Sequence, residues 1–528
     1  MTDAGLLHNA YDQVPYRSLP FPQSHPDRLA TIATLFGMSP TPLRQARILE
    51  LGCSSGGNLL PIADQFSQSH CLGIDASARQ IGLGNDVLQS SQLKNAELRQ
   101  QGIEALQNDK PFDYIVCHGV YSWVPDSVQD AILDVVQKHL APNGVAYISY
   151  NTYPGWHMRA MIRDVMLFRA KFFDSPEEKL EQARGLLTFL TNSIKSENNA
   201  YGMMLRNELE SISRSEDYYL MHDHLEEINE PIYFHDFAER LAQKELQYVG
   251  EADFGVMSLD NFPENVRGML QSVSRNRVEL EQYMDFLRNR AFRQTLITHR
   301  STSLSPNADE RRMINLRIAS NAAAETEQFD PRSNDQVSFR RKGSVLTTSD
   351  PVVKAAMLHL RKVWPHSVPF TELAATARSF VAGRPVPVDS EILSDASLQL
   401  ARTLLRCFAT SMIDLHVEQP TFTTQVSNTP ETAPLARVQA ARESAVTNRL
   451  HEYTPLDDIQ RFVLRKLDGR TDMAALTDLV AQAAETGELL LFHPDGRRVE
   501  ETQDVRSVLR DMLPQVVLSL ARRALLVR

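Results

Sequence analysis

An apolar run that ends in an acidic residue passes directly into a glycine-rich loop, ILELGCSSGGNLL, between Ile48 and Leu60. A dinucleotide site needs G-x-G-x-x-G, but Ser54 stands where the middle glycine belongs. A P-loop needs Gly-Lys-Ser/Thr, and a nucleophile elbow needs G-x-S-x-G; neither motif is present here. The loop therefore does not carry the signature of a phosphate site or of a serine hydrolase.

The residues around this loop alternate between strand-like and helical patterns from Arg47 to Tyr150. Strand, helix and strand repeat at a spacing of about 25 residues, which is typical of a parallel sheet covered on both faces. The predicted strands are Arg47–Leu51, His70–Asp75, Phe112–Cys117 and Val145–Tyr150, and the predicted helices are 58–68, 78–92 and 127–140. We therefore expect an α/β fold with a Rossmann-like core.

The remaining pattern, E-x-G-x-x-x-G-G, resembles the first motif of class I S-adenosylmethionine-dependent methyltransferases. That ligand carries no phosphate, so the loop does not need to form an anion nest. The backbone must instead come close to the ligand, which glycine allows at Gly52 and Gly56. The resemblance implies that Glu50 holds the loop or the amino group of the ligand. The alternative is a tight strand-to-helix turn that binds nothing.

Further positions in the same order fit this family. Asp75 ends the second predicted strand, 23 residues after Gly52, where a carboxylate can accept hydrogen bonds from both ribose hydroxyls. Its alternative role is the N-cap of the next helix. The segment RQQGIEAL (99–106) stands where the family places its adenine contacts. The complete set of predicted cofactor contacts is Tyr11, Tyr16, Glu50, Gly52, Cys53, Gly56, Asp75, Ala76, Gly102, Ile103, Glu104, His118 and Gly119.

Sequence blocks outside the core extend the resemblance from about Tyr11 to about Trp364. They are YNTYPGWHMR (150–159), LEEINEPIYFHDFAERLAQKELQYVGEADF (225–254) and LTTSDPVVKAAMLHLRKVWP (346–365). Together they resemble bacterial methyltransferases with a methyltransferase-regulatory domain, a family that includes rickettsial lysine methyltransferases acting on an outer-membrane protein. The resemblance implies a Rossmann-like core, a helical insertion that can form a dimer, a middle domain and a winged-helix-like C-terminal part.

Four segments follow from these patterns. A core with an N-terminal lid covers 1–155, a helical insertion and regulatory domain covers 156–325, a winged-helix-like domain covers 326–418 and a C-terminal helical domain covers 419–528. The strand predicted at Leu246–Glu251 is expected to rejoin the first sheet. The lid is expected within residues 1–25, which combine tyrosines and prolines and lack the periodicity of a core element.

Aromatic residues gather near the expected point of methyl transfer. Rings at Tyr121, Trp123, Tyr153 and Trp156, with Tyr11 and Tyr16, would favour a cation beside the sulfonium, or would simply pack a lid onto the sheet. The predicted catalytic residues are His118, Tyr121, Trp123 and Tyr153. Of these, His118 is the one expected to accept a proton near neutral pH.

The predicted function is transfer of a methyl group from S-adenosylmethionine to lysine side chains of a protein, in a cytoplasmic enzyme that can form a homodimer. The alternatives are a small-molecule methyltransferase and a non-catalytic sensor of S-adenosylmethionine whose winged-helix domains contact DNA. The net charge of -11 disfavours nucleic acid as a partner, because such binding depends on neutralising phosphates. Four scattered cysteines indicate a reducing compartment, and we expect no metal and no membrane span.

Overall fold

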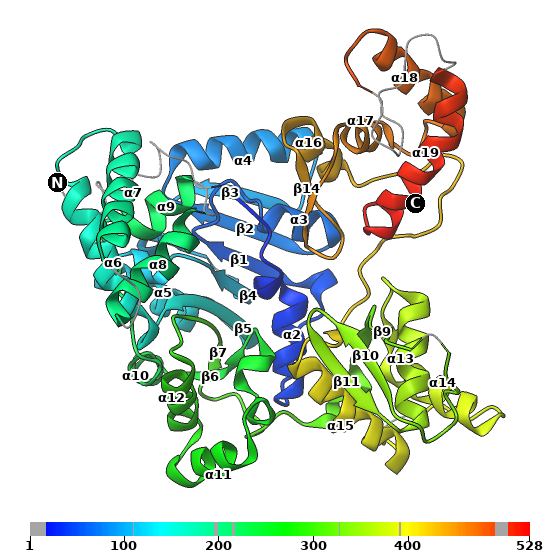
Figure 1. Cartoon of the computed structure of the whole chain (residues 1–528), viewed down its shortest axis with the longest axis horizontal. Helices are drawn as coiled ribbons and strands as arrows, with labels where there is room; N and C mark the ends of the chain where they lie inside the picture. Colours follow the sequence, from blue (N-terminus) through cyan, green and yellow to red (C-terminus); the bar gives the residue numbers. More distant parts are fainter. Residues whose placement is uncertain are drawn as a thin grey trace.

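The computed structural model describes residues 17–108, 110–194, 199–213, 217–326, 328–389, 392–490 and 505–528. Its centre is a seven-stranded sheet with the order β3-β2-β1-β4-β5-β7-β6 (Figure 1). The strands are β1 Arg47–Leu51, β2 His70–Asp75, β3 Ala96–Gln100, β4 Phe112–Cys117, β5 Leu140–Asn151, β6 Leu246–Glu251 and β7 Phe292–His299. Strands β1 to β5 are parallel, and β7 lies antiparallel between β5 and β6.

The four strands predicted in the core are confirmed, and so is the return of the 246–251 strand to the same sheet. The sequence did not predict β3 or β7. Because β6 and β7 complete the sheet, it extends beyond the core of residues 1–155 that the sequence predicts. The strand order reverses direction beside β1, which opens a crevice at the carboxyl ends of the strands, where ligands bind in open α/β sheets.

Helices cover both faces of the sheet, and alternate residues of each strand pack against opposite layers. Ile48 packs with α2 (Pro26–Leu35), α3 (Leu59–Gln65) and α4 (Ala78–Ser91), whereas Leu49 and Leu51 pack with α5 (Asp126–His139) and α10 (Phe234–Gln243). Burial on both faces explains why the strands are almost continuously apolar.

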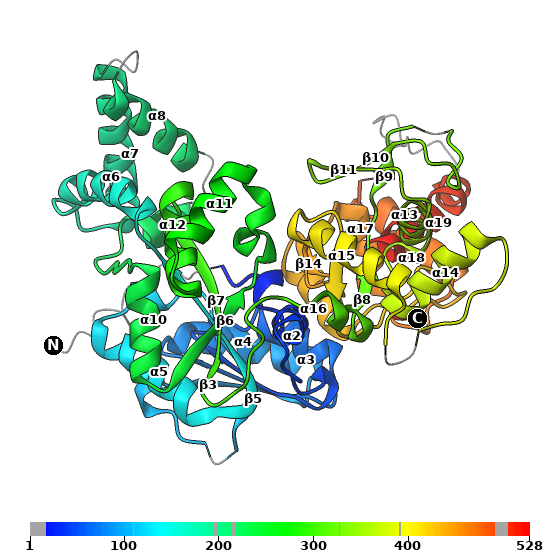
Figure 2. The ribbon, with the colours of Figure 1, turned by 90° about the horizontal axis from the view of Figure 1, so that it is seen from below.

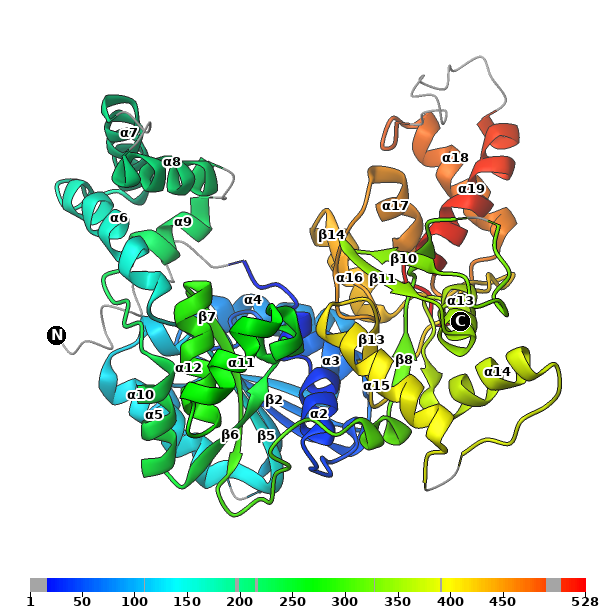
Figure 3. The ribbon, with the colours of Figure 1, turned by 60° about the horizontal axis from the view of Figure 1, so that its bottom comes forward.

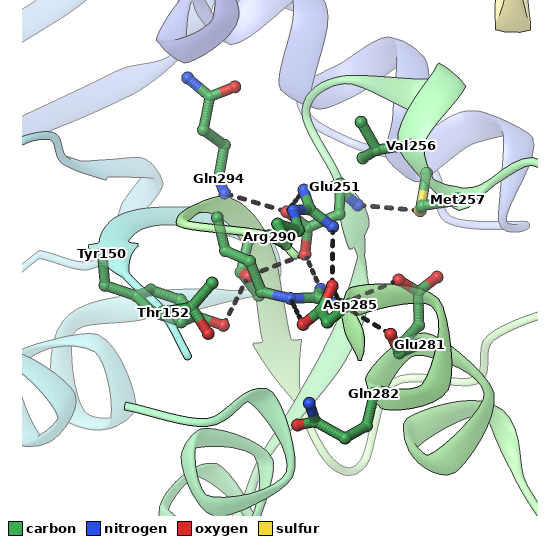
Figure 4. Close-up of polar contacts among 12 residues, drawn as sticks. Tyr150, Thr152, Glu251, Val256, Met257, Glu281, Gln282, Asp285, Arg290 and Gln294 are labelled. Atoms are coloured by element: carbon green, nitrogen blue, oxygen red, sulfur yellow. Dashed lines mark hydrogen bonds and ion pairs between the residues drawn. The ribbon is translucent and has the colours of Figure 1, made fainter. Parts of the chain in front are cut away.

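A buried ion-pair cluster attaches α12 (Arg277–Arg288) to β6 and β7 (Figure 4). Arg293 of β7, which is fully buried, donates to Glu251 at 2.6 Å, to Asp285 at 2.8 Å and to Glu281 at 3.1 Å. Arg290 adds a contact of 3.1 Å to Glu251. Buried charges are tolerated when they are paired and hydrogen-bonded, so this cluster fixes α12 and the start of β7 beside the carboxyl end of β5.

Four helices between β5 and β6 form an arm that projects from the sheet (Figures 2 and 3). They are α6 Gly155–Ala170, α7 Pro176–Ser193, α8 Ala200–Ser213 and α9 Asp217–His224. Ser175 caps α7 by accepting a hydrogen bond from the Glu178 amide. The arm has a hydrophobic core of its own, which includes Ile162, Leu187 and Leu205.

The part after β7 shares a hydrophobic core with one face of the sheet. Two small sheets, β11-β10-β9 and β12-β8-β13, lie among α13, α14 and α15, and Phe339 and Phe370 are buried in the same core as Ile48. The elements are β8 Arg317–Ala319, β9 Ala323–Ala324, β10 Val337–Arg341, β11 Ser344–Thr348, α13 Pro351–Val363, β12 Val368–Pro369, α14 Phe370–Ala382, α15 Asp395–Ala409 and β13 Asp414–His416, whereas α11 Glu264–Val273 lies before β7. Helices α13, α14 and α15 and strand β13 fall in the segment 326–418, for which the sequence predicts a winged-helix-like domain.

The C-terminal part has a second, separate core that includes Val463, Leu476 and Leu513. It contains α16 Pro434–Arg442, β14 Ala445–Thr447, β15 Tyr453–Pro455, α17 Asp458–Lys466, α18 Met473–Glu485 and α19 Val505–Arg522. Helix α16 packs on α3 and α4 of the core (Figure 1). Among the helices in the described ranges, none has the length and apolarity needed to cross a bilayer.

Candidate functional site

A cavity of about 650 Å³ lies at the carboxyl ends of β1, β2 and β4, within the size range of small-molecule sites. Its wall includes most of the predicted cofactor contacts, which reach it from four separate loops. These residues are Glu50, Gly52, Cys53, Asp75, Ala76, Gly102, Ile103, Glu104, His118 and Gly119. Tyr11 and Tyr16 lie outside the described residues, and Gly56 lies in the loop but not in the wall.

The glycine loop adopts a backbone that only small residues allow. Gly52 has φ +70° and Gly56 has φ +79°, both in the left-handed region. A Cβ atom on Gly52 would lie 2.5 Å from the Cγ2 atom of Val120, which also lines the cavity. The glycine at position 52 is therefore required by both backbone angle and space.

Glu50 is buried at the end of β1 and uses only one of its two carboxylate oxygens. Oε1 accepts a hydrogen bond of 2.8 Å from Nδ2 of Asn58, whereas Oε2 has no partner among the described residues. Burial, with a smaller contribution from the nearby Asp75, raises the pKa of Glu50 to about 8, although the hydrogen bond from Asn58 lowers it. A cation in the cavity would both lower that pKa and satisfy Oε2.

Asp75 shapes the loop as well as facing the cavity. Its Oδ2 accepts from the Ser54 amide at 2.8 Å, and its Oδ1 accepts from the Ser77 amide at 2.9 Å. Ser77, not Asp75, is the N-cap of α4, since its side chain accepts from the Gln80 amide. The alternative role of Asp75 as a helix cap is therefore filled by another residue.

His118 lies at the end of β4 under the ring of Phe21, with 3.9 Å between ring centroids, and its Nδ1 lies 2.9 Å from the Tyr147 hydroxyl. Burial lowers the pKa of His118 to about 4. Desolvation disfavours the imidazolium, so this burial argues against His118 as the group that accepts a proton near neutral pH. His118 contributes a neutral ring to the cavity.

Within the described part of the chain, the aromatic residues predicted to guide the substrate do not form one cage. Trp123 lines the cavity and packs edge-on against Trp156, with ring centroids 6.2 Å apart. Tyr121 is fully buried behind the wall, against Phe237. Tyr153 stacks on His157 at 4.1 Å and does not line the cavity. Two of the four predicted catalytic residues, His118 and Trp123, thus face the cavity.

Several wall residues were not predicted. Arg17, Ser18 and Phe21 come from the described end of the expected lid, and Asn58 from the residue before α3. His222 and Asp223 come from the last turn of α9. The sequence offered one local signal for Asn58, which is a polar residue eight positions after Glu50. No local sequence pattern connects α9 to the cavity.

The residues present fit S-adenosylmethionine. The unpartnered Oε2 of Glu50 is an acceptor suited to an α-ammonium group, and Asp75 presents a carboxylate suited to ribose hydroxyls. Ile103, Val124 and Trp123 offer apolar surface suited to a base. Each of these groups matches one chemical part of the ligand.

Three protein families match separate stretches of the chain. They are described as a methyltransferase domain (residues 49–146), a predicted methyltransferase regulatory domain (216–299) and the PKMT C-terminal winged helix domain (428–525). The winged-helix match falls in the segment for which the sequence predicts a C-terminal helical domain.

Similarity to individual proteins extends over the whole chain. The uncharacterized protein RP789 of Rickettsia prowazekii is 33% identical over 537 residues, covering 98% of this chain and 94% of that protein. The uncharacterized protein RP028 of the same organism is 44% identical over 236 residues, covering 44% of this chain and 94% of that protein. The structure of PKMT2 from Rickettsia typhi in complex with AdoHcy superposes with a TM-score of 0.85 and 29% identity, covering 97% of this chain and 100% of PKMT2.

Proposed function

The chain belongs to the bacterial S-adenosylmethionine-dependent methyltransferases that carry a methyltransferase regulatory domain, and we propose that its methyl acceptor is the ε-amine of lysines in a protein. The observation that carries this proposal is the likeness to PKMT2 over the whole length of both chains, including the C-terminal domain. A likeness confined to the core would support methyl transfer but no class of acceptor.

The cofactor supplies an electrophilic methyl group on a sulfonium. The residues of this chain that would hold it are Glu50 at its ammonium and Asp75 at its ribose, with the glycine loop in close backbone contact. The rings of Phe21, His118 and Trp123 line the cavity, where they would help to exclude water from the acceptor. Their role is to align the acceptor with the methyl group, which is where most of the rate gain of such a displacement arises.

The acceptor amine must lose its proton before it attacks. With a lysine pKa of about 10.4, deprotonation at pH 7 costs about 4.6 kcal/mol. Because its pKa is lowered, His118 is a weak base. Desolvation of the lysine amine beside the rings would lower the pKa of that amine and so offset part of this cost. We therefore expect the rate to rise with pH up to about pH 9 without a sharp titration from His118.

The direct test is mass spectrometry of lysine-rich proteins after incubation with the enzyme and S-adenosylmethionine. The proposal expects lysines to gain about 14 Da per methyl group, and the Asp75→Ala variant to abolish this gain. If only a small-molecule fraction is methylated, the acceptor is a metabolite and the lysine proposal is wrong. If neither fraction is methylated although the cofactor binds, the chain is a sensor.

The helical arm supports a homodimer as part of this proposal. Phe168 and Phe172 of α6 and Phe189 of α7 are 61%, 62% and 63% exposed although the arm has its own core. Exposed apolar patches of this kind mark interfaces, and a second copy would present the same face in a two-fold pairing. Light scattering should give a dimer for the wild type and a monomer for Phe172→Glu, with Phe380→Glu on α14 as the matched exposed control.

A further inference from the structure

A histidine from the C-terminal part of the chain reaches the back of the cofactor loop. His451 lies in the turn between β14 and β15, and its Nε2 is 2.8 Å from Oδ1 of Asn58, 393 residues earlier in the sequence. Both side chains are 3% exposed. The contact therefore lies inside the interface between the C-terminal domain and the core.

Asn58 connects this contact to Glu50 through the two ends of its amide. Oδ1 accepts from His451 and from the Phe21 amide at 2.9 Å, while Nδ2 donates to Oε1 of Glu50 at 2.8 Å. The Ser24 hydroxyl lies 3.3 Å from Oδ1 and 3.1 Å from Nδ2 and therefore does not distinguish the two ends of the amide. Because the oxygen faces the nitrogen donors of His451 and Phe21, the amide nitrogen is held toward the carboxylate. The orientation of Asn58, and with it the position of Glu50, depends in part on His451.

The turn that carries His451 is held rigidly from both sides. Oδ1 of Asn448 accepts from the amides of Leu450 and Glu452, each at 2.9 Å. Arg449 forms a largely buried ion pair of 3.0 Å with Asp64 of α3. His451 has φ +60°, a left-handed conformation that these surrounding contacts maintain. These contacts hold the imidazole of His451 against Asn58 although the backbone of His451 is locally strained.

We propose that His451 is a positioning residue of the cofactor site, acting through Asn58 to hold Glu50 where it binds the ammonium of the cofactor. The C-terminal domain is then part of the cofactor-binding unit and is more than an appended partner-binding module. The inference rests on the assignment of the cofactor site, but it is independent of which acceptor is methylated.

The test is calorimetric titration of the full-length protein with two ligands. S-adenosylhomocysteine carries the ammonium, whereas 5′-methylthioadenosine lacks the whole amino-acid part. His451→Leu removes the donor and should weaken S-adenosylhomocysteine about five- to tenfold, the usual effect of one buried hydrogen bond, while leaving 5′-methylthioadenosine within about twofold. The glutamine of His451→Gln also carries an N–H donor, at nearly the same distance from the backbone. This variant should therefore keep most of the affinity for S-adenosylhomocysteine.

A double-mutant cycle separates positioning from a general loss of structure. In a Glu50→Gln background, His451→Leu should have little further effect on S-adenosylhomocysteine, because the group it positions is already neutralised. His366→Leu, a matched histidine change outside the site, should leave both ligands unaffected. If His451→Leu does not fold, His451→Asn provides the same comparison with a shorter side chain.

Three results would overturn the proposal. The first is unchanged affinity for S-adenosylhomocysteine in a folded His451→Leu or His451→Asn protein. The second is equal weakening of both ligands, and the third is effects of His451→Leu and Glu50→Gln that add in full; either of these would mean that His451 acts by another route. None of the three bears on lysine methylation, which the mass-spectrometric test decides separately.

Discussion

Asn58 donates one hydrogen bond of 2.8 Å to Oε1 of Glu50, a residue that lines the cavity, whereas Oε2 of Glu50 has no partner among the described residues. A buried acid in this state is poorly solvated, and its pKa is raised to about 8. Ionisation of this carboxyl group therefore lowers the stability of the fold, and an ammonium bound beside it would offset that cost.

Replacing Glu50 with glutamine is expected to separate stability from binding. Because the folded pKa lies above the unfolded value of 4.5, the wild type loses stability as pH rises from about 4.5 to about 8, and this loss is complete above that window. Glu50→Gln should therefore melt higher than the wild type near pH 8.5 and bind S-adenosylhomocysteine at least tenfold more weakly. Scanning calorimetry and titration calorimetry measure the two effects; a lower melting temperature near pH 8.5 would contradict this account.

Cofactor binding is expected to release a proton from Glu50. With a pKa of about 8, this group is roughly nine-tenths protonated at pH 7, and an ammonium beside it would lower that pKa. Titration with S-adenosylhomocysteine near pH 7, in buffers of different ionisation enthalpy, should reveal close to one proton released. Glu50→Gln should abolish the release, and a buffer-independent heat in the wild type would disprove the linkage.

Gly52→Ala should damage the loop through one specific clash. The added Cβ would lie 2.5 Å from Cγ2 of Val120, in a backbone with φ +70°. We expect a stability loss of about 1–3 kcal/mol and at least tenfold weaker cofactor binding. Val120→Ala removes the clashing atom and should recover part of the stability. Gly82→Ala, on α4 with open space around it, is the control and should be neutral or stabilising by up to about 1 kcal/mol.

Arg293→Met should destabilise the fold by about 3–5 kcal/mol, because it leaves buried carboxylates without their partner. Glu251, Glu281 and Asp285 would then repel one another, so their pKa values should rise in the variant. Stability lost through raised acid pKa values grows with pH, so urea denaturation should show a larger difference from wild type at pH 8 than at pH 5. Arg275→Met, at a side chain 86% exposed, should change stability by less than about 0.5 kcal/mol. A pH-independent difference would mean that lost packing, and not charge, dominates.

The core strands and the ligand loop could be predicted from the sequence because their signals are local. A buried parallel strand is an apolar run, and a left-handed turn after it needs glycine, so Glu50, Gly52 and Asp75 could be placed at strand ends without a structure. Strands β3 and β7 were missed because ELRQ within Ala96–Gln100 and FRQTLITH at Phe292–His299 mix charged and apolar residues. In the sequence, Arg293 of β7 resembles a surface residue. Its burial is possible only because folding places three acidic partners beside it.

Long-range contacts decided what the side chains do. Tyr121 and Trp123 are two residues apart, yet one is fully buried behind the wall and the other faces the cavity. His118 is a weak base because Phe21 and the sheet remove its water, and Glu50 keeps its proton for the same reason. The sequence by itself determined which residues stand at the ends of the strands and therefore which ligand the chain holds. Only the tertiary structure decided their protonation and their support by His451, because desolvation and hydrogen bonding depend on atoms that are hundreds of residues away along the chain.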